Sequence, residues 1–343
     1  MTTLLTGATG LVGANLAHLL CSRGEKPRLL ARERSDRRGL RGLVRGRDYE
    51  EARGDILDAA SLREALRGVT HVYHAAGTVR FDPFSRQDLV RINTEGTRNV
   101  LEAARAAGVR RLVFVSSVAA GGHGTLDHPA DESTPFNYAG DNPYHQSKRE
   151  AEQLALAANA PGFEVLAGCP GYVVGPYDVR PSSGELLLYV ARGVVAAYPS
   201  GGINVVNAAD VAEGLRLVME KGAPGERYIL GGENLTYRQF LTTIAEEVGV
   251  APPRLPMPRA ALQGAGRLGD VVGRLSPELF KFVNTAFLQA LTLPAYQSSG
   301  RAMRELGYHP RPVRLGIREA LRWFQEEGLL PRDQPLTPRG IVA

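Results

Sequence analysis

Short apolar runs alternate with amphipathic stretches along the first half of the chain. The runs are four to six residues long and nearly continuous, which is typical of strands buried on both faces of a parallel sheet. They predict strands at Thr3–Thr6, Arg28–Ala31, Asp48–Arg53, His71–His74, Leu112–Val115 and Phe163–Ala167. Helical spacing predicts helices over Leu11–Ser22, Ser61–Arg67 and Ser85–Ala107, and from about Pro143 onward. This alternation favours an α/β fold in which helices cover both faces of the sheet.

The pattern changes past Gly168, where prolines and glycines become dense and strand signals become scarce. Glu226–Leu230 remains as one strand candidate. We therefore expect a first domain over residues 1–170, to whose sheet residues 203–231 return, and a smaller, mostly helical second domain over residues 171–330. The Pro-rich residues 331–343 are expected to form a loose tail.

Composition places the chain among ordinary globular proteins. With 343 residues, 43% of them hydrophobic, it can bury a sizeable core without a disulfide or metal staple. Cys21 and Cys169 lack metal-ligand spacing, so we expect no metal site, and two lone thiols suit a reducing compartment. The N-terminus lacks the pattern of a signal peptide, and no apolar run approaches the roughly 18 residues of a membrane span. A cytoplasmic protein without a membrane partner is the expectation.

Positive charge gathers in one stretch of the chain. The net charge is +5 and the pI about 9.3, and nine basic residues lie between Lys26 and Arg47. Such a pI is compatible with nucleic-acid binding, but the chain carries no nucleic-acid motif. We therefore expect no nucleic-acid partner and attribute the charge to a general bias toward arginine.

A glycine-rich turn follows the first predicted strand and opens the first predicted helix. Gly7, Gly10 and Gly13 stand at spacing G-x-x-G-x-x-G, where they would permit a tight turn, a close approach to a pyrophosphate and close packing of helix on strand. The helix N-terminus would direct free N–H groups toward the phosphates. The expected contacts of a dinucleotide in this turn are Gly7, Thr9, Gly10, Leu11, Val12 and Gly13.

The residues that follow the second predicted strand bear on the choice between NAD and NADP. An acid there would bind the ribose 2′-hydroxyl, whereas the guanidinium of Arg32, 19 residues after Gly13, suits a 2′-phosphate. We predict a preference for NADP(H), with NAD as the alternative if Glu33 contacts the ribose instead. Asp55 and Ile56 end the third strand, where Asp55 could meet the adenine amino group or serve as a helix N-terminal acid.

Tyr144 and Lys148 carry the candidate chemistry. Their i, i+4 spacing places them on one face of the predicted helix. We expect the ammonium of Lys148 to lower the pKa of the tyrosine, so that Tyr144 can exchange a proton with a carbonyl or alcohol. Ser117 follows a strand at the carboxyl edge of the sheet and could hold the same substrate oxygen. A Tyr-x-x-x-Lys pair is common by chance, and an ordinary helix-surface pair is the alternative.

The order of these motifs is more specific than any one of them. The glycine turn, His74-Ala75-Ala76-Gly77, Asn93, Ser116-Ser117 and Tyr144 with Lys148 resemble the short-chain dehydrogenase/reductase superfamily, in particular its extended branch, the NAD-dependent epimerase/dehydratase family. The resemblance covers residues 1–330 and implies a Rossmann doubly wound sheet and a catalytic triad of Ser117, Tyr144 and Lys148. It also implies that Lys148 contacts the cofactor, together with Ala75, Ala76, Gly77, Asn93, Pro170, Gly171, Tyr172 and Val173.

Two reactions remain open within this branch. Sugar-nucleotide epimerases typically carry an asparagine and a diphosphate-binding arginine where this chain has Tyr172 and Ile203, and without them a diphosphate would be poorly compensated. Stretches 175–178, 225–234 and 304–308 are similar instead to dihydroflavonol 4-reductase relatives, which implies reduction of a ketone or aldehyde. Bacterial members that resemble hopanoid-associated sugar epimerases share these stretches, so a sugar substrate stays an alternative. A catalytically inactive dinucleotide sensor is a third hypothesis.

The substrate pocket is harder to predict. Arg80 and Phe81 follow the Gly77 turn, His123 lies in the loop after Ser117, and Tyr172 follows the last strand. We expect these four residues near a small carbonyl or sugar substrate, although each could also be a solvated loop residue. We expect His145 to be structural. The family resemblance further implies a possible homodimer through the Tyr144 helix and the Ser85–Ala107 helix.

Overall fold

The computed structural model describes residues 2–82, 85–139, 142–273 and 283–336. Its main feature is a seven-stranded sheet in the order β10-β6-β5-β4-β1-β2-β3, in which all neighbouring strands are parallel. The strands are β1 (Thr3–Thr6), β2 (Arg28–Ala31), β3 (Glu50–Arg53), β4 (His71–His74), β5 (Arg111–Val115), β6 (Glu164–Pro170) and β10 (Arg227–Leu230). The predicted α/β doubly wound sheet is confirmed, and the continuous apolar runs match central strands because both of their faces are covered.

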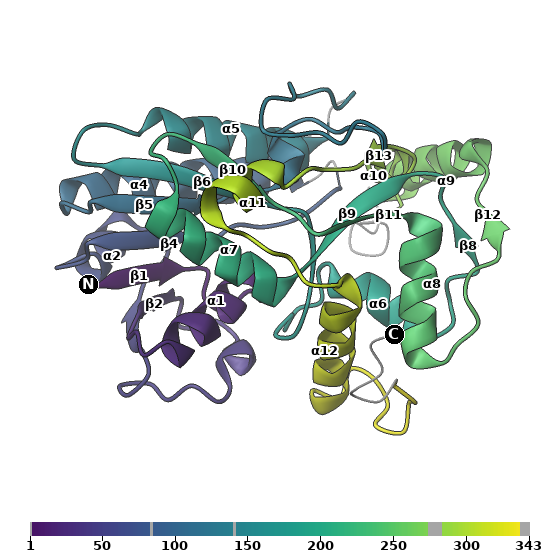
Figure 1. Ribbon diagram of the computed structural model, residues 1–343, viewed down its shortest axis with the longest axis horizontal. Coiled ribbons are helices and arrows are strands. Elements are labelled where there is room, and N and C mark those ends of the chain that lie inside the picture. Colours follow the sequence, from purple (N-terminus) through teal and green to yellow (C-terminus); the bar gives the residue numbers. More distant parts are fainter. Residues whose placement is uncertain (1, 83–84, 140–141, 274–282, 337–343) are drawn as a thin grey trace.

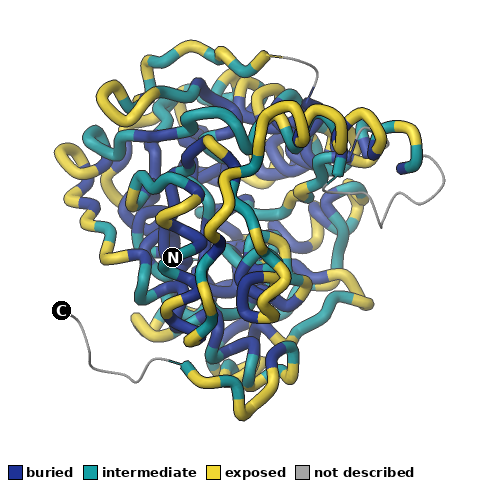
Figure 2. The backbone as a smooth tube through the Cα atoms, turned by 90° about the vertical axis from the view of Figure 1, so that its right-hand side faces the viewer, coloured by how far each residue is buried: buried dark blue, intermediate teal, exposed yellow. Residues whose placement is uncertain are grey.

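Two helical layers cover the sheet (Figure 1). Helices α1 (Leu11–Ser22) and α7 (Ala208–Lys221) pack against each other over one face, and α11 (Gly300–Leu306) contacts α7 and β10. On the other face lie α2 (Ala59–Ala65), α4 (Gly96–Ala106) and α5 (Pro143–Ala157). Each layer forms a separate apolar core with the side of the sheet that it covers. Figure 2 shows this interior as buried segments within a rim of exposed loops and helix faces.

The predicted helix over Ser85–Ala107 is interrupted in the middle. It consists of α3 (Arg86–Leu89), a π-helical segment η3 (Val90–Glu95) and α4. A π-helical turn admits one extra residue, and such turns are frequent at functional sites. The predicted helix is therefore present from Arg86 to Ala106, but the π-helical turn in its middle was not predicted, because apolar periodicity over six residues cannot separate the two kinds of turn. Asn93 lies within η3.

The second half of the chain adds strands that the sequence did not predict. A smaller sheet has the order β11-β9-β13, with β7 paired to β9. Its strands are β7 (Tyr172–Val174), β9 (Gly202–Asn207), β11 (Glu233–Thr236) and β13 (Pro294–Ala295). Strands β8 (Ala197–Tyr198) and β12 (Leu255–Pro256) form a separate pair. Within the segment 203–231, β10 is a strand of the large sheet and α7 packs against that sheet. Strand β9 belongs to the small sheet.

Helices surround the smaller sheet. Among them α6 (Gly184–Ala191), α8 (Tyr237–Val248) and α12 (Val313–Glu326) share a third apolar core with β7 and β9. Helices α9 (Arg259–Val272) and α10 (Thr285–Ala290) pack on each other beside it. Of the expected tail 331–343, residues 337–343 lie outside the described part of the chain. No helix in the described ranges combines the length and the hydropathy that a membrane crossing requires.

The strand order determines where a ligand can bind. From β1 the chain crosses to β2 on one side, and β4 then pairs with β1 on the other side. The strand order therefore reverses between β1 and β4, and parallel α/β sheets bind ligands at the carboxyl ends of strands at this point. The turns that begin at Gly7 and Ala75 follow β1 and β4 directly, so the predicted cofactor turns lie at this point of the sheet.

Candidate active site

The two predicted cofactor turns are packed against each other. Gly7 has φ +72°, and a Cβ atom there would lie 2.5 Å from the carbonyl carbon of Ala75 and 2.5 Å from the nitrogen of Ala76. Only glycine permits both this backbone conformation and this approach. The backbone N–H of Ala76 also donates to Oγ1 of Thr6 at 3.2 Å. The structure therefore brings the β1 turn and the β4 turn together at one edge of the sheet.

The N-terminus of α1 is built to receive an anion. Gly10 is its N-cap and supplies no side-chain cap, so the first N–H groups of the helix are left for a ligand. A Cβ at Gly13 would collide with the carbonyl group of Gly7. Because glycine has no Cβ, helix and turn can pack this closely. Thr9, Leu11 and Val12 are partly exposed beside them. The residues predicted to contact a pyrophosphate therefore lie together at the N-terminus of α1.

The residues expected at the adenosine end lie next to each other. A guanidinium nitrogen of Arg32 is 4.0 Å from a carboxylate oxygen of Asp55, and both side chains are partly exposed. Asp55 accepts a hydrogen bond from the N–H of Leu57, while Asp58 is the N-cap of α2. Ile56 is buried against the α4 residue Gly96. Asp55 is therefore not the N-cap of α2, and its partly exposed carboxylate lies beside Arg32.

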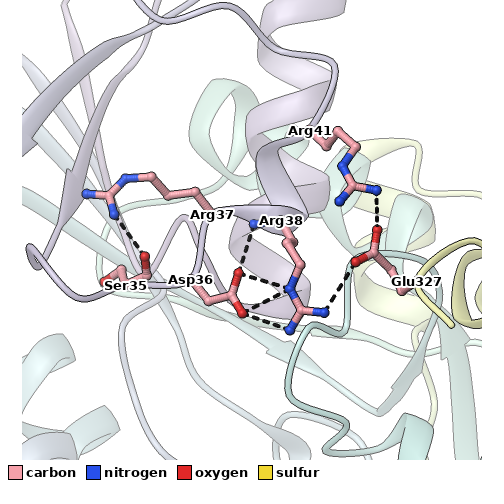
Figure 3. Close-up of polar contacts among 6 residues, drawn as sticks. All are labelled: Ser35, Asp36, Arg37, Arg38, Arg41 and Glu327. Atoms are coloured by element: carbon pink, nitrogen blue, oxygen red, sulfur yellow. Dashed lines mark hydrogen bonds and ion pairs between the residues drawn. The ribbon is translucent and has the colours of Figure 1, made fainter. Parts of the chain in front are cut away.

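Other arginines in the same stretch are held by carboxylates (Figure 3). Arg38 pairs with Asp36 at 2.8 Å and with Glu327 at 3.3 Å, and Arg41 reaches the same Glu327 carboxylate at 2.5 Å. The Glu327 side chain is only 4% exposed. It follows α12 in sequence, so these ion pairs tie the loop after β2 to the C-terminal helix. The local excess of positive charge is thus partly compensated within the protein.

The three predicted catalytic residues lie together at the carboxyl end of β5. Tyr144 and Lys148 are on the first turns of α5, which begins at Pro143 as predicted and is capped by the side chain of Asn142. The side chain of Ser117 lies near the Tyr144 hydroxyl and favours its ionised form. The ammonium of Lys148 donates to the carbonyl oxygen of Val115 at 3.0 Å. Tyr144 and Lys148 are both more than nine-tenths buried.

Burial dominates the protonation of this group. Desolvation raises the pKa of Tyr144, and the nearby Ser117 side chain opposes this only in part. Desolvation also lowers the pKa of Lys148 to about 8. We expected Lys148 to lower the pKa of Tyr144, and this expectation was wrong for the protein alone: the ammonium is directed at Val115, and burial disfavours the phenolate. Tyr144 is therefore a protonated phenol at neutral pH, suited to donate a proton.

Asn93 connects the β4 turn to the catalytic helix. Its amide nitrogen donates to the carbonyl oxygen of Thr78 and to Oγ of Ser147, both at 3.1 Å, and its amide oxygen accepts from the N–H of Thr78 at 2.8 Å. Thr78 follows Gly77, and Ser147 precedes Lys148. Because its polar atoms are engaged within the protein, Asn93 is placed to hold these two segments in register. The sequence pointed to Asn93 but gave no signal for its partners.

Aromatic rings flank the Tyr144 side chain. Phe81 meets Tyr144 edge to face with ring centroids 5.1 Å apart, and Phe287 of α10 lies 5.1 Å from Phe81. On the other side Tyr138 packs on His145 at 4.1 Å, and His123 lies 4.9 Å from Tyr138. The structure thus places Phe81 beside Tyr144 and links His123 to it through two rings. Phe287 and Tyr138 were missed, because only the tertiary fold brings them here.

The remaining predicted contacts have specific partners. Arg80 forms an ion pair with Asp82 at 3.1 Å. The Tyr172 hydroxyl donates to the carbonyl oxygen of Ser183 at 2.6 Å and its ring packs on Phe240, so only the backbone of Tyr172 remains for the expected contact. Pro170 ends β6, a Cβ at Gly171 would collide with Asn204, and Val173 pairs with β9. Residues 170–173 therefore continue from the carboxyl end of β6, the strand that pairs with β5.

Known proteins resemble this chain along most of its length. The model of the NAD dependent epimerase/dehydratase family matches residues 3–231. Sterol demethylase protein B of Methylococcus capsulatus is 37% identical, covering 96% of this chain and 100% of that protein. A putative dihydroflavonol 4-reductase of Synechocystis sp. is 32% identical, covering 94% of each.

Solved structures agree with this similarity. The crystal structure of gox2253 has a TM-score of 0.82 and 36% identity, covering 95% of this chain and 98% of that one. The UDP-glucose 4-epimerase of Thermus thermophilus in complex with NAD has a TM-score of 0.72 and 25% identity, covering 95% and 99%. The chain therefore belongs to the NAD dependent epimerase/dehydratase family, and it is an enzyme of the extended short-chain dehydrogenase/reductase type.

Proposed function

We propose that this enzyme reduces a ketone or aldehyde with NADPH, using Tyr144 as the general acid. The observation that carries the proposal is the buried Tyr144 phenol, near Ser117 and one helical turn from Lys148, at the carboxyl edge of the sheet where the glycine turn would place a dinucleotide. The glycine cradle and the open helix N-terminus fit the cofactor's phosphates. The bound nicotinamide would supply the hydride to the carbonyl carbon.

The three side chains divide the remaining work. Tyr144 donates its proton to the carbonyl oxygen as negative charge develops there, and Ser117 holds that oxygen by a hydrogen bond. Lys148 stabilises the phenolate that Tyr144 becomes and holds the cofactor ribose. General acid catalysis of this kind contributes roughly 10²–10⁴-fold to the rate. The raised pKa of Tyr144 suits this direction, because the phenol is protonated before substrate binds.

The surroundings of Tyr144 favour an apolar carbonyl compound over a nucleotide sugar. The ring of Phe81 lies beside the phenol and Phe287 packs on Phe81, and aromatic rings bury large apolar area. Ile203, at the position where epimerases typically carry an arginine, packs against the third apolar core. A diphosphate would lack charge compensation at that position. The likeness to a UDP-glucose 4-epimerase keeps sugar epimerisation as the alternative.

Two arginines support the proposed preference for NADP. Arg32 is exposed beside Asp55, and Arg34 is exposed without an ion pair to any residue in the described ranges. A guanidinium in this position can bind a 2′-phosphate through two parallel hydrogen bonds. Asp55 opposes this in part, because its charge lies near the same guanidinium. The neighbouring structure with NAD makes NAD the alternative cofactor.

A panel of aldehydes and ketones tests the function directly. The protein is expected to oxidise NADPH with at least one apolar carbonyl compound, and Tyr144→Phe should lower kcat by about 10²–10⁴-fold while leaving the cofactor Kd unchanged. Tyr73→Phe is the matched control, since it removes another buried phenol, which lies on β4. Wild-type turnover in Tyr144→Phe would refute the role of the phenol. Isomerisation of a sugar nucleotide without net NADPH oxidation would favour the epimerase.

We also propose that the boundary at residues 170 and 171 separates a cofactor domain from a substrate domain. The seven-stranded and the four-stranded sheet are separate from each other, which supports this division.

We further propose that two copies of the chain associate through α5 and the helical segment 86–106. Analytical ultracentrifugation of the full chain would test the dimer, since a monomer at all concentrations contradicts it.

A further inference from the structure

A buried charged cluster lies behind the catalytic helix. Glu152, four residues after Lys148 on α5, is only 5% exposed. One carboxylate oxygen accepts a hydrogen bond from the Cys169 thiol at 3.1 Å, and the other lies 3.2 Å from Nε of Arg227. The three residues come from α5, β6 and β10. None of them has a role in the proposed proton transfer itself.

Arg227 connects this cluster to the loop that carries Ser117. A Cβ at Gly121 would lie 2.8 Å from one terminal nitrogen of Arg227 and 2.9 Å from the other, so the guanidinium packs directly on the Gly121 backbone. Gly121 follows the short helix η4 (Val118–Ala120), which Ser117 caps. The Glu152–Arg227 pair therefore supports both segments that present the catalytic side chains.

The charges around Lys148 single out Glu152. Five titratable groups belong to its surroundings: His74 on β4, Cys169 on β6, Arg227 on β10, which pairs with Glu152, and Tyr144 and Glu152, each one turn away on α5. Burial lowers the pKa of His74 and raises the pKa of both Cys169 and Tyr144, so these three groups are neutral at pH 7. Of the five groups, Glu152 is therefore the anion, and its charge acts on both Arg227 and Lys148.

We propose that Glu152, one helical turn after Lys148 on α5, is a positioning residue that favours the charged form of Lys148, with Arg227 and Cys169 holding the carboxylate. A buried carboxylate needs such partners, because its desolvation is otherwise strongly unfavourable. The catalytic value of this arrangement rests on the proposed function, in which a charged Lys148 stabilises the phenolate. The electrostatic effect on Lys148 itself does not depend on any substrate.

The sign of the effect follows from the two opposing influences on Lys148. Burial lowers the pKa of this lysine to about 8, and the charge of Glu152 opposes that fall. Without the Glu152 carboxylate the pKa of Lys148 should fall further, past 7. A large part of Lys148 would then be uncharged at pH 7. An opposite charge within about 4–6 Å typically shifts a pKa by about 1–3.

Lysine NMR tests this in the full-length protein without a substrate. The chain has four lysines, Lys26, Lys148, Lys221 and Lys281, so selective ¹⁵N labelling gives few signals, and the Lys148 signal is identified by its absence in Lys148→Met. Glu152→Gln should lower the measured pKa of Lys148 by about 1–3. The matched control is Glu150→Gln, which removes an exposed carboxylate from the same helix and should leave the titration unchanged.

Glu152→Asp provides a second measurement if Glu152→Gln does not fold. It keeps the charge but withdraws it by one methylene, so it should give a smaller shift in the same direction. If neither variant moves the Lys148 titration relative to Glu150→Gln, the proposal is overturned. A shifted titration in a protein that reduces no carbonyl compound would support the role of Glu152 and count against the proposed function instead. If reduction is observed, the basic limb of kcat/KM should move to lower pH in Glu152→Gln but not in Glu150→Gln.

Discussion

Gly13→Ala is the sharpest local test of the cofactor turn. The added Cβ would lie 2.7 Å from the carbonyl carbon of Gly7 and 2.9 Å from Cα of Ala8. Ordinary contact begins at 3.4 Å, so the carbonyl carbon alone must retreat by about 0.7 Å (3.4 minus 2.7). The obstructing atoms are backbone, which cannot swing away as a side chain can. Helix and turn must therefore separate at the point where the pyrophosphate is expected.

Two energies compete in this variant. Overpacking of a tight site costs about 1–3 kcal/mol, whereas alanine stabilises a helix interior by about 1 kcal/mol relative to glycine. We therefore expect little or moderate loss of stability, up to about 2 kcal/mol, and a larger loss of cofactor affinity. A displacement near 1 Å can reduce function by about 10²-fold, so the NADPH Kd should rise at least about 10-fold.

Calorimetric titration with NADPH and urea unfolding measure the two effects. Gly264→Ala is the control, because Gly264 lies in α9 and a Cβ added there would have no atom within 4 Å. It should be neutral or stabilising and leave the NADPH Kd unchanged. If Gly13→Ala binds NADPH as tightly as the wild type, the turn is either more compliant than its packing indicates or not the phosphate site.

Three further predictions address the cofactor, pH and the C-terminal helix. Arg32→Ala should raise the KM for NADPH about 10-fold or more and leave the KM for NADH nearly unchanged; equal changes for both cofactors would contradict 2′-phosphate recognition. Burial lowers the pKa of His74 to about 3, so its stabilisation is complete above the unfolded pKa near 6.5 and is lost as pH falls. Between pH 7 and pH 5 the wild type should lose about 2 kcal/mol more unfolding free energy than His74→Gln, measured by urea unfolding, and parallel pH profiles would count against this. Glu327→Gln should destabilise the protein by about 1–2 kcal/mol, because it weakens the ion pairs of a buried carboxylate with the half-exposed Arg38 and Arg41. The control is Glu326→Gln, which changes an exposed carboxylate; equal stability of both variants would show that Glu327 does not hold the loop after β2.

Local patterns anticipated the first half of the fold closely. Strands β1, β2 and β4 begin and end at the residues predicted for them, because a strand buried on both faces must be apolar along its whole length. The third strand ends at the predicted residue, but its predicted start lies two residues before the start of β3. Because β3 is an edge strand, its polar residues obscure where it begins. The glycine turn and the spacing of Tyr144 and Lys148 were equally readable, because both are relations within one helical turn or one loop.

Other features arise from contacts between distant segments. The small sheet joins β7, β9, β11 and β13, of which β13 is two residues long, and such strands leave little periodicity to detect. The same is true of Phe287, which meets Phe81 from a helix far along the chain. Arg227 reaches Glu152 only because β10 is added beside β6. No local pattern encodes these pairings.

The sequence by itself determined the order of elements, the glycine turn and which side chains could perform the chemistry. These properties depend on residue type and short spacing, which are fixed by covalent connection. The tertiary structure alone decided the protonation of the site, because the pKa of Tyr144 and of Lys148 follows from burial. Burial depends on which distant segments exclude water from those atoms, and water exclusion is a property of the packed chain, not of neighbours in sequence.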